Sequence, residues 1–231
     1  MSAASVSAVP SVVSPAVSPD RSTRLIVFAK APAAGQAKTR LIPALGREGA
    51  AALAARLLDQ TVAQAAAAAA RLGGGVELCV TPGLDHPQFA ALQARHGLEL
   101  SVQGEGDLGQ RMHRALARAL QHHTTAVLIG TDAPALDAAM LEAAAAALAL
   151  HDAVFVPALD GGYALVGQRR PCATLFEGMA WSTPQVMAAT RERALQAGIT
   201  WAELPAVADI DEPADLVNLP AGWLPMPPLP R

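Results

Sequence analysis

Aromatic residues are scarce in this sequence and make up only 3% of its 231 positions. Hydrophobic residues are nevertheless 52% of the chain, so its core must be built from Ala, Val and Leu. A chain of this length can bury such a core without disulfides or metal ions as supports. We therefore expect one globular domain, over residues 23–219, with a tail at each end.

Cysteine is scarce as well. Cys79 and Cys172 are the only two, they form no CxxC pair, and the six histidines are scattered without an HExxH motif. This composition does not predict a structural zinc site. Cys79 lies in the apolar run VELCV and is expected to be buried as a small hydrophobic residue.

The chain has no basic run, and its net charge is −3. A sequence-independent nucleic-acid binder would need clustered Lys and Arg, so this class is not expected. Residues 1–22 lack the basic and apolar regions of a signal peptide and predict a disordered tail. The apolar run 65–70 is too short to span a membrane. We therefore expect a cytoplasmic protein without membrane or nucleic-acid partners, and the sequence carries no signal for an oligomeric state.

Predicted strands alternate with predicted helices along the chain. The strands are expected at 25–29, 76–80, 98–102, 126–129, 153–156, 163–166 and 200–204. The helices are expected at 47–72, 87–96, 107–121, 135–150, from 183 onward, and at 212–219, before a Pro-rich tail at 220–231. Continuous apolar runs such as 25–29 are typical of parallel strands that are buried on both faces. The pattern predicts an α/β fold with a single, mostly parallel sheet flanked by helices, in which ligands bind at the carboxyl ends of the strands.

The loop after the first strand holds a glycine and three cationic side chains. Its candidate nucleotide-binding residues are Lys30, Gly35, Lys38, Thr39 and Arg40. Glycine lets the backbone approach an anion closely, and Lys and Arg supply charge to phosphate oxygens. In this loop after the first strand there is no GxGxxG, and no glycine stands at the upstream P-loop position, so both of those fingerprints are excluded here. The alternative is a solvated basic turn.

Carboxylates follow two later strands. Asp132 comes directly after the strand at 126–129, and Asp209 and Asp211 precede the last predicted helix. Mg²⁺ prefers hard oxygen ligands and is usually held by one or two carboxylates together with substrate phosphates. These residues are candidate metal ligands. The alternative is that Asp132 and Asp211 cap the helices that follow them.

The turn formed by Asp160, Gly161, Gly162 and Tyr163 lies between two short predicted strands. Paired glycines permit close approach of a ligand, and Asp160 would then act as a base or a substrate contact. The alternative is a hairpin turn, for which Asp-Gly is a strong signal.

Two further segments precede predicted helices. In Trp181-Ser182-Thr183, capping explains Thr183, whereas Trp181 is a candidate pocket residue. In the segment GDLGQRM, Asp107 is either a helix cap or part of a loop that, with Arg111, contacts a base or ribose.

Six segments together resemble a known bacterial family. They are AKAPAAGQAKTRL (29–41), GDLGQRM (106–112), LIGTDAP (128–134), PALDGGYALVG (157–167), WST (181–183) and DIDEPADL (209–216). Each segment alone is weak evidence for the family, but all six in this order are specific for it. The chain resembles the GT-A-superfamily transferases described as glycosyltransferase-like or as radical SAM/selenodomain-associated transferase 1, some of which are called arsenosugar-biosynthesis glycosyltransferases. It is more distantly similar to phospholactate guanylyltransferases and molybdenum-cofactor nucleotidyltransferases.

This resemblance implies a nucleotide-diphospho-sugar transferase fold over residues 24–219. It implies that Gly35, Lys38 and Arg40 hold nucleotide phosphates, and that Asp132 ligates Mg²⁺ or Mn²⁺ with Asp211 or Asp209. The GT-A pattern often shows DxD, whereas this chain has Thr-Asp-Ala at 131–133.

Three functions follow as hypotheses. The first is glycosyl transfer from a nucleotide sugar to a small acceptor, with Asp132, Asp160 and Lys38 as catalytic residues and with 160–163 and 181–183 around the acceptor. The second is nucleotidyl transfer from a nucleoside triphosphate to a phosphorylated acceptor, with release of pyrophosphate. The third is a non-catalytic nucleotide-binding module.

Overall fold

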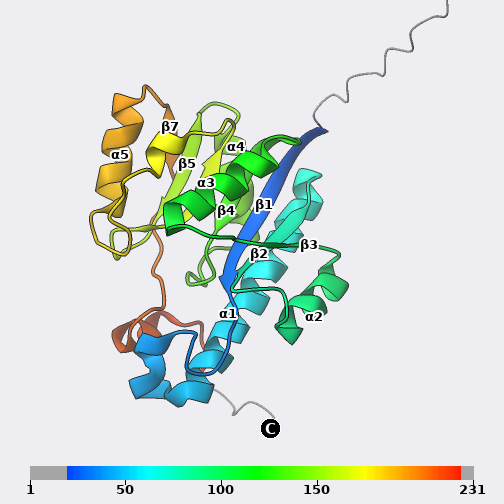
Figure 1. Ribbon diagram of the computed structural model, residues 1–231, viewed down its shortest axis with the longest axis vertical. Coiled ribbons are helices and arrows are strands. Elements are labelled where there is room, and N and C mark those ends of the chain that lie inside the picture. Colours follow the sequence, from blue (N-terminus) through cyan, green and yellow to red (C-terminus); the bar gives the residue numbers. More distant parts are fainter. Residues whose placement is uncertain (1–19, 225–231) are drawn as a thin grey trace, which may run out of the picture.

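The apolar runs of the sequence form a single seven-stranded sheet in the computed structural model, which describes residues 20–224 (Figure 1). The strands are β1 (Asp20–Lys30), β2 (Val76–Thr81), β3 (Glu99–Val102), β4 (His123–Ile129), β5 (Ala153–Pro157), β6 (Tyr163–Gln168) and β7 (Trp201–Glu203). Their order is β3-β2-β1-β4-β6-β5-β7, and within the described chain only β6 runs antiparallel to its neighbours. The prediction of a mostly parallel sheet is confirmed.

Five helices and three short 3₁₀ turns connect these strands in the described residues. They are η1 (Thr39–Leu41), α1 (Ile42–Leu72), α2 (Pro87–His96), α3 (Leu108–Ala119), α4 (Ala138–Ala147), η2 (Ala173–Leu175), α5 (Val186–Gln196) and η3 (Pro213–Asn218). The first turn of α1 is separated from the rest by a break at Gly46. The helix ends at Gly73, which adopts a left-handed conformation with φ of 64° and donates its N–H to the Ala69 carbonyl. This is the glycine stop that the sequence predicts.

Helices cover both faces of the sheet. Leu25 and Val27 point into one core cluster with α1, α2 and α4, whereas Ile26 and Phe28 point into another with α3 and α5. The alternation explains why β1 is apolar at every position from Leu25 to Ala29. The alanines of α1 give close packing, since Ala65 and Ala68 are fully buried against this sheet face.

The start of α1 and the end of the described chain lie side by side below the sheet (Figure 1). Leu41, Leu57 and Ile210 form a third apolar cluster together with Trp223. Trp223 falls in the segment for which an extended tail is expected, yet it is buried, with the Arg56 guanidinium 4.3 Å from its ring centroid. The rest of the predicted tails, residues 1–19 and 225–231, lie outside the described residues, and β1 already begins at Asp20.

Several predicted helix starts differ from the structure by up to five residues, and two of them also differ in their caps. The helix expected from Thr183 begins three residues later, at Val186, and Thr183 donates its hydroxyl to the Ala180 carbonyl instead of capping the helix. The last predicted helix is a 3₁₀ turn, capped by Glu212 rather than by Asp211. Pro184 and Pro213 mark both regions, but a proline fixes φ without deciding where regular α-helical hydrogen bonding starts.

Candidate active site

A cavity of about 510 Å³ lies beyond the carboxyl ends of β1, β2 and β4. Because neighbouring parallel strands end at the same edge of a sheet, residues that are distant in sequence meet here. Four basic side chains line this cavity, together with two carboxylates: Lys30, Lys38, Arg40, Arg111, Asp132 and Asp211. We call it the larger cavity.

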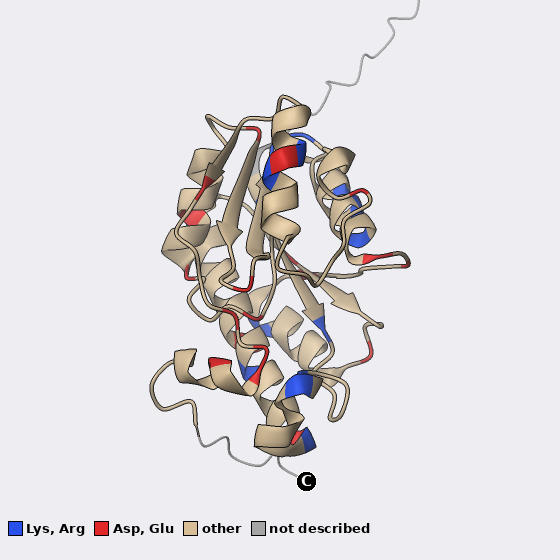
Figure 2. Ribbon diagram, turned by 90° about the vertical axis from the view of Figure 1, so that its left-hand side faces the viewer, with Lys and Arg blue, Asp and Glu red and all other residues tan. Residues whose placement is uncertain are grey.

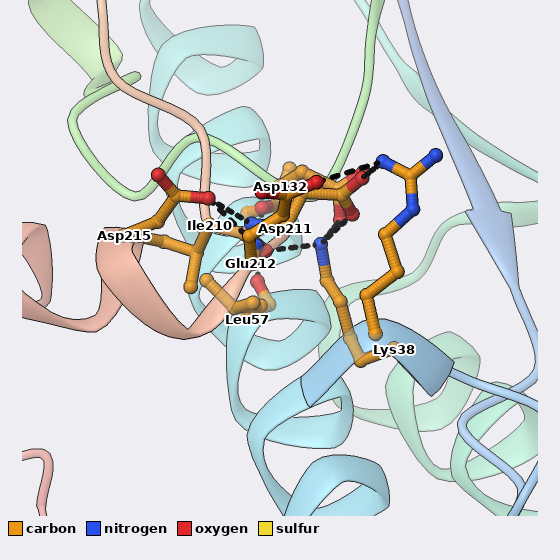
Figure 3. Close-up of polar contacts among 9 residues, drawn as sticks. Lys38, Leu57, Asp132, Ile210, Asp211, Glu212 and Asp215 are labelled. Carbon is orange, nitrogen blue, oxygen red and sulfur yellow. Dashed lines mark hydrogen bonds and ion pairs between the residues drawn. The ribbon is translucent and has the colours of Figure 1, made fainter. Parts of the chain in front are cut away.

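Lys38 lies at the centre of the polar contacts in this cavity (Figure 3). Its backbone is left-handed, with φ of 48° and ψ of 44°, and its side chain is only 7% exposed. The ammonium nitrogen is 2.5 Å from Asp132 Oδ1 and 3.4 Å from Asp211 Oδ1, and it donates to the Ile210 carbonyl at 2.6 Å. Its three N–H donors therefore have three acceptors within reach, and both carboxylates are held at one cation.

Asp132 projects from the loop that follows β4, and its side chain is 51% exposed. It does not cap the next helix, because α4 begins at Ala138 and is capped by Asp137, whose side chain accepts from the Met140 N–H. The Asp132 carbonyl accepts the Ile210 N–H at 2.8 Å, which fixes the loop after β4 to the segment that carries Asp211. The capping alternative is therefore wrong for Asp132.

Asp211 also faces the basic loop. Arg40 Nη1 donates to Asp211 Oδ2 at 3.1 Å, and it lies 3.7 Å from Glu212. The backbone N–H groups of Asp211 and Glu212 both donate to Asp215, so the start of η3 is fixed while the Asp211 carboxylate remains turned toward the cavity. Capping thus belongs to Glu212 and Asp215.

A second cavity, of about 250 Å³, adjoins the first. The two share lining residues that include Gly130, Asp132, Tyr163 and Asp211. Of these two cavities, only the second is lined by the candidate acceptor residues Asp160, Gly162, Trp181, Ser182 and Thr183, and by Asp209. We call it the smaller cavity. Asp132 and Asp211 lie at the boundary between the two.

Asp209 does not share the contacts of Asp211 with Lys38. It lines the smaller cavity with Asp160, and burial, followed by the charge of Asp160, raises the pKa of its carboxyl. The structure therefore distinguishes the two aspartates that the sequence leaves equivalent: Asp211 faces the cations, and Asp209 faces another carboxylate.

The segment 160–163 is a turn between the antiparallel strands β5 and β6. Asp160 is exposed, and its Oδ1 accepts the Gly162 N–H at 2.8 Å. Gly161 does not line either cavity; it has φ of +93°, and a Cβ there would lie 2.1 Å from the Pro184 carbonyl oxygen. The segment is therefore the hairpin turn of the second alternative, and its backbone packs on 184–187. Asp160 and Gly162 face the smaller cavity, and a role for Asp160 as a base or substrate contact stays a prediction.

An aromatic pair forms one wall of the smaller cavity. Tyr163 and Trp181 meet edge to face, with ring centroids 6.3 Å apart. Burial raises the pKa of the Tyr163 hydroxyl. Gly109 of α3 packs so closely on Trp181 that a Cβ would lie 2.5 Å from its ring. The indole is thus held in place by α3, which begins within the segment GDLGQRM.

Asp107 caps α3 and stays outside both cavities. Its side chain accepts the Gln110 N–H, and the Gln110 side chain accepts the Asp107 N–H, in a reciprocal capping box. Arg111, one turn later, does line the larger cavity. Its guanidinium donates to Gln103 Oε1 at 3.0 Å.

Gln103 is a site residue that sequence analysis missed. It is buried, it lines the larger cavity, and its amide nitrogen donates to the carbonyls of Ala29 and Cys79. It therefore ties Arg111 to the ends of β1 and β2. Its position directly after β3 is the signal that was available, since residues that follow the strands of a parallel sheet lie at this edge.

The other residues of the basic loop divide into two groups. Lys30, Thr39 and Arg40 line the larger cavity and are exposed. Gly35 does not line it; its left-handed φ of 77° turns the loop beside the Arg47 side chain. Gly35 therefore shapes the loop that presents Lys38 and Arg40.

Within residues 20–224, no group of three or more His, Cys, Asp or Glu side chains is arranged to hold a metal ion by itself. Over the same residues, the helices are too short or too polar to cross a membrane.

Comparison with known proteins assigns the chain to a family. The profile of the family DUF2064, described as an uncharacterized protein conserved in bacteria, matches residues 61–183. The chain belongs to this family. A search of curated proteins found no match.

Solved structures relate this DUF2064 member to the nucleotide-diphospho-sugar transferase fold. A protein from Desulfovibrio desulfuricans G20, provisionally named a nucleotide-diphospho-sugar transferase, is 30% identical over 84% of both chains, with a TM-score of 0.75. The fold is shared with 4-diphosphocytidyl-2C-methyl-D-erythritol synthase from Anaerococcus prevotii DSM 20548, at 9% identity, 86% and 96% coverage and a TM-score of 0.56. It is also shared with glucosyl-3-phosphoglycerate synthase from Mycobacterium tuberculosis, solved with Mn²⁺, UDP and product, at 10% identity, 86% and 75% coverage and a TM-score of 0.50. The resemblance seen in the sequence is confirmed at the level of family and fold.

Proposed function

We propose that this protein transfers a glycosyl group from a nucleotide sugar to a small acceptor, with the aid of a divalent cation. The observation that carries the proposal is the Lys38 ammonium, which holds Asp132 and Asp211 together where two cavities meet. A donor and an acceptor in these cavities would approach each other over this charged cluster. The similar Desulfovibrio protein, with its provisional name, supports the same class of reaction.

The larger cavity suits the nucleotide diphosphate of the donor. Lys30, Arg40 and Arg111 present cationic groups around it, and phosphate oxygens bind such groups by charge-assisted hydrogen bonds. Arg40 contacts Asp211 through Nη1 and its side chain is 61% exposed, so its outer face is accessible to a ligand. Lys38 acts indirectly: it holds the two carboxylates and balances their charge.

The donor atoms at the boundary fit Mg²⁺ or Mn²⁺. Asp132 and Asp211 offer carboxylate oxygens that are about half exposed and already converge on one cation, the Lys38 ammonium. Two carboxylates are a common protein contribution to an Mg²⁺ site, where substrate phosphates and water complete the shell. This agrees with the absence of a three-residue metal cage among residues 20–224. When bound, the cation would neutralise charge on the leaving diphosphate.

The acceptor would enter the smaller cavity. Asp160 lies there beside Gly162, with its carboxylate exposed, and would accept the proton of the attacking hydroxyl group. Arg40 and Arg111 would stabilise charge on the departing nucleoside diphosphate from the other side. The chain's own contribution is therefore to bind two substrates on either side of Asp132 and to remove one proton.

Substitution of Asp132 by Asn tests the proposal. Asp132→Asn removes one of the two carboxylates at the boundary and should lower nucleoside diphosphate release at least 100-fold, as expected for the loss of transition-state charge stabilisation. Because Asp132 is half exposed and caps no helix, the melting temperature should stay close to that of the wild type. Asp85→Asn, an exposed aspartate outside both cavities, is the control. Full activity of Asp132→Asn would refute the role of this carboxylate.

Nucleotidyl transfer is the second candidate, and the shared fold of a diphosphocytidyl transferase favours it. The same basic cavity would then hold a nucleoside triphosphate, and a phosphorylated acceptor would attack its α-phosphate. Product analysis separates the two reactions, because nucleotidyl transfer releases pyrophosphate whereas glycosyl transfer releases a nucleoside diphosphate. A thermal-shift screen of nucleotide sugars and nucleoside triphosphates, with and without Mn²⁺, identifies the donor first, since a ligand of the folded state raises its melting temperature.

A further inference from the structure

The two cavities differ sharply in charge. Four Lys or Arg side chains line the larger cavity. The smaller cavity is lined by four aspartates, Asp132, Asp160, Asp209 and Asp211, and its lining contains no Lys, Arg or His. In Figure 2, several acidic loop segments gather between the ends of the strands and the helices below them. The acceptor side is therefore acidic, although the donor side is basic.

Only two of these four aspartates are balanced by cations. Asp132 and Asp211 contact Lys38, and Asp211 also contacts Arg40. Asp160 and Asp209 make no ion pair with any residue in the described part of the chain; Asp160 accepts only the Gly162 N–H. A ligand in the smaller cavity thus meets two carboxylates that form no ion pair with the described residues.

The aromatic wall adds polar groups that lack partners. Tyr163 Oη and Trp181 Nε1 are buried atoms, and neither has a hydrogen-bond partner among the described residues. Both side chains line the smaller cavity. Buried polar atoms are normally hydrogen-bonded, so the unpaired hydroxyl and indole N–H leave this wall with unsatisfied donors just behind its surface. The surface that the two residues present to the cavity is aromatic and carries no charge.

We infer that the acceptor is a small hydroxyl-bearing molecule that carries no anionic group, and whose charged group, where it has one, is an amine. The inference rests on the proposed function. A phosphate or carboxylate on the acceptor would be placed beside Asp160 and Asp209 at a cost in repulsion, whereas an ammonium group would be attracted by them. The aromatic faces of Tyr163 and Trp181 suit the carbon skeleton of a polyol or sugar.

The step is balanced without a further reactant. The acceptor oxygen forms a bond to the anomeric carbon of the donor as the bond from that carbon to the diphosphate oxygen breaks. The acceptor proton passes to the Asp160 carboxylate, and the electron pair of the broken bond leaves with the nucleoside diphosphate. No other group in the smaller cavity must change its oxidation state or covalent bonding.

The test uses acceptors with matched skeletons and different charge. Glycerol, 2-amino-1,3-propanediol and glycerol 3-phosphate form one series, and glucose, glucosamine and glucose 6-phosphate form another. Initial rates of nucleoside diphosphate release and the mass of the product are measured with the full chain and the donor found by thermal shift. We expect kcat/KM for the uncharged and amine members to exceed that of the phosphorylated member at least tenfold in each series.

The charge itself is tested by Asp209→Asn and Asp209→Lys. Both should reduce the preference for glucosamine over glucose 6-phosphate, and the Lys variant should reduce it more, whereas the control Asp85→Asn should leave it unchanged. Equal or faster transfer to the phosphorylated members by the wild type overturns the inference and leaves the proposed function intact. Absence of nucleoside diphosphate release with all six acceptors overturns the proposed function, and the inference with it.

Discussion

Lys38 combines three unusual properties in one residue. Its backbone is left-handed, its side chain is buried, and all three of its donors have acceptors on segments that are far away in sequence. A non-glycine residue in this conformation carries a cost in free energy that the surrounding contacts must offset. The two carboxylates are thus positioned by a cation that is part of the chain.

Removal of the Lys38 ammonium should change both the turnover and the stabilisation of the protein by added Mn²⁺. Lys38→Met removes the cation that Asp132 and Asp211 share and leaves only Arg40 beside Asp211, so we expect a loss of turnover of at least 100-fold and a melting temperature a few degrees lower. Added Mn²⁺ should then raise the melting temperature of the variant more than that of the wild type, because the unpaired carboxylates favour a cation.

Lys30→Met is the matched control, since Lys30 lines the same cavity but makes no ion pair with another described residue. It should weaken donor binding without altering the stabilisation by Mn²⁺. An equal Mn²⁺ response in wild type and Lys38→Met would contradict the role assigned to Lys38.

The hairpin between β5 and β6 depends on one glycine that contacts the segment before α5. The Gly161 carbonyl accepts the Met187 N–H at 2.8 Å, and a Cβ at Gly161 would lie 2.1 Å from the Pro184 oxygen. Gly161→Ala should therefore lower the free energy of unfolding by about 1 to 3 kcal/mol and raise KM for the acceptor, because Asp160 shifts with the turn. Urea unfolding and steady-state kinetics measure the two effects.

Gly178→Ala is the control that separates the backbone strain of a positive φ from the steric clash of an added Cβ. Gly178 also has a positive φ, of 59°, but no atom lies within 4 Å of its hypothetical Cβ. It should cost less stability than Gly161→Ala and leave the acceptor KM unchanged. A Gly161→Ala variant with an unchanged acceptor KM would show that the hairpin does not position Asp160.

Much of the element pattern could be predicted from the sequence. All seven strands were expected near their observed positions, because continuous apolar runs such as 25–29 are required where helices cover both sheet faces. The start of α5 was not predicted correctly. Thr183 and Pro184 have the residue types of a helix start, but they form a turn against Gly161 instead. The same tertiary contact decides where regular hydrogen bonding begins, and it is absent from the local sequence.

At the scale of the whole molecule, the site depends on contacts between distant segments. Sequence order made Lys38, Asp132 and the pair Asp209 and Asp211 candidates, because they lie in loops that follow predicted strands. The distinction between Asp209 and Asp211 arises only when residue 210 pairs with Asp132, and the role of Gln103 only when β1, β2 and α3 meet around it. Such contacts follow from the topology and leave no local pattern.

The site also depends on the C-terminal segment, through the packing of Trp223. Its indole covers Leu57 and Ile210, next to the backbone that presents Asp211. Trp223→Ala should lower the free energy of unfolding by about 3 kcal/mol and raise KM for the donor, because the loop at 208–212 loses its packing. Trp201→Ala, on the β7 edge, should reduce stability while leaving the donor KM unchanged; a similar rise in KM for both variants would contradict this link.

A different carboxylate, Asp152, lies toward the far edge of the sheet and contributes to the pH dependence of the stability of the fold in acid. Asp152 accepts hydrogen bonds from the backbone N–H and hydroxyl of Thr200 and pairs with Arg169 and Arg170. The Thr200 backbone bond is the main cause that lowers its pKa to about 2, against the effect of burial. The ordinary value is about 3.9, so the folded state binds this proton less tightly than the unfolded state.

Asp152 therefore stabilises the fold at a pH above about 4, and this contribution is lost as the pH falls toward 2. Asp152→Asn should lower the free energy of unfolding at pH 7 by roughly 1 to 2 kcal/mol, and the difference from the wild type should shrink between pH 4 and pH 2. Urea titrations across this range measure it, with Asp85→Asn as the control. A deficit that stays constant from pH 7 to pH 2 would mean that Asp152 acts through packing rather than charge, because an uncharged role does not depend on the proton.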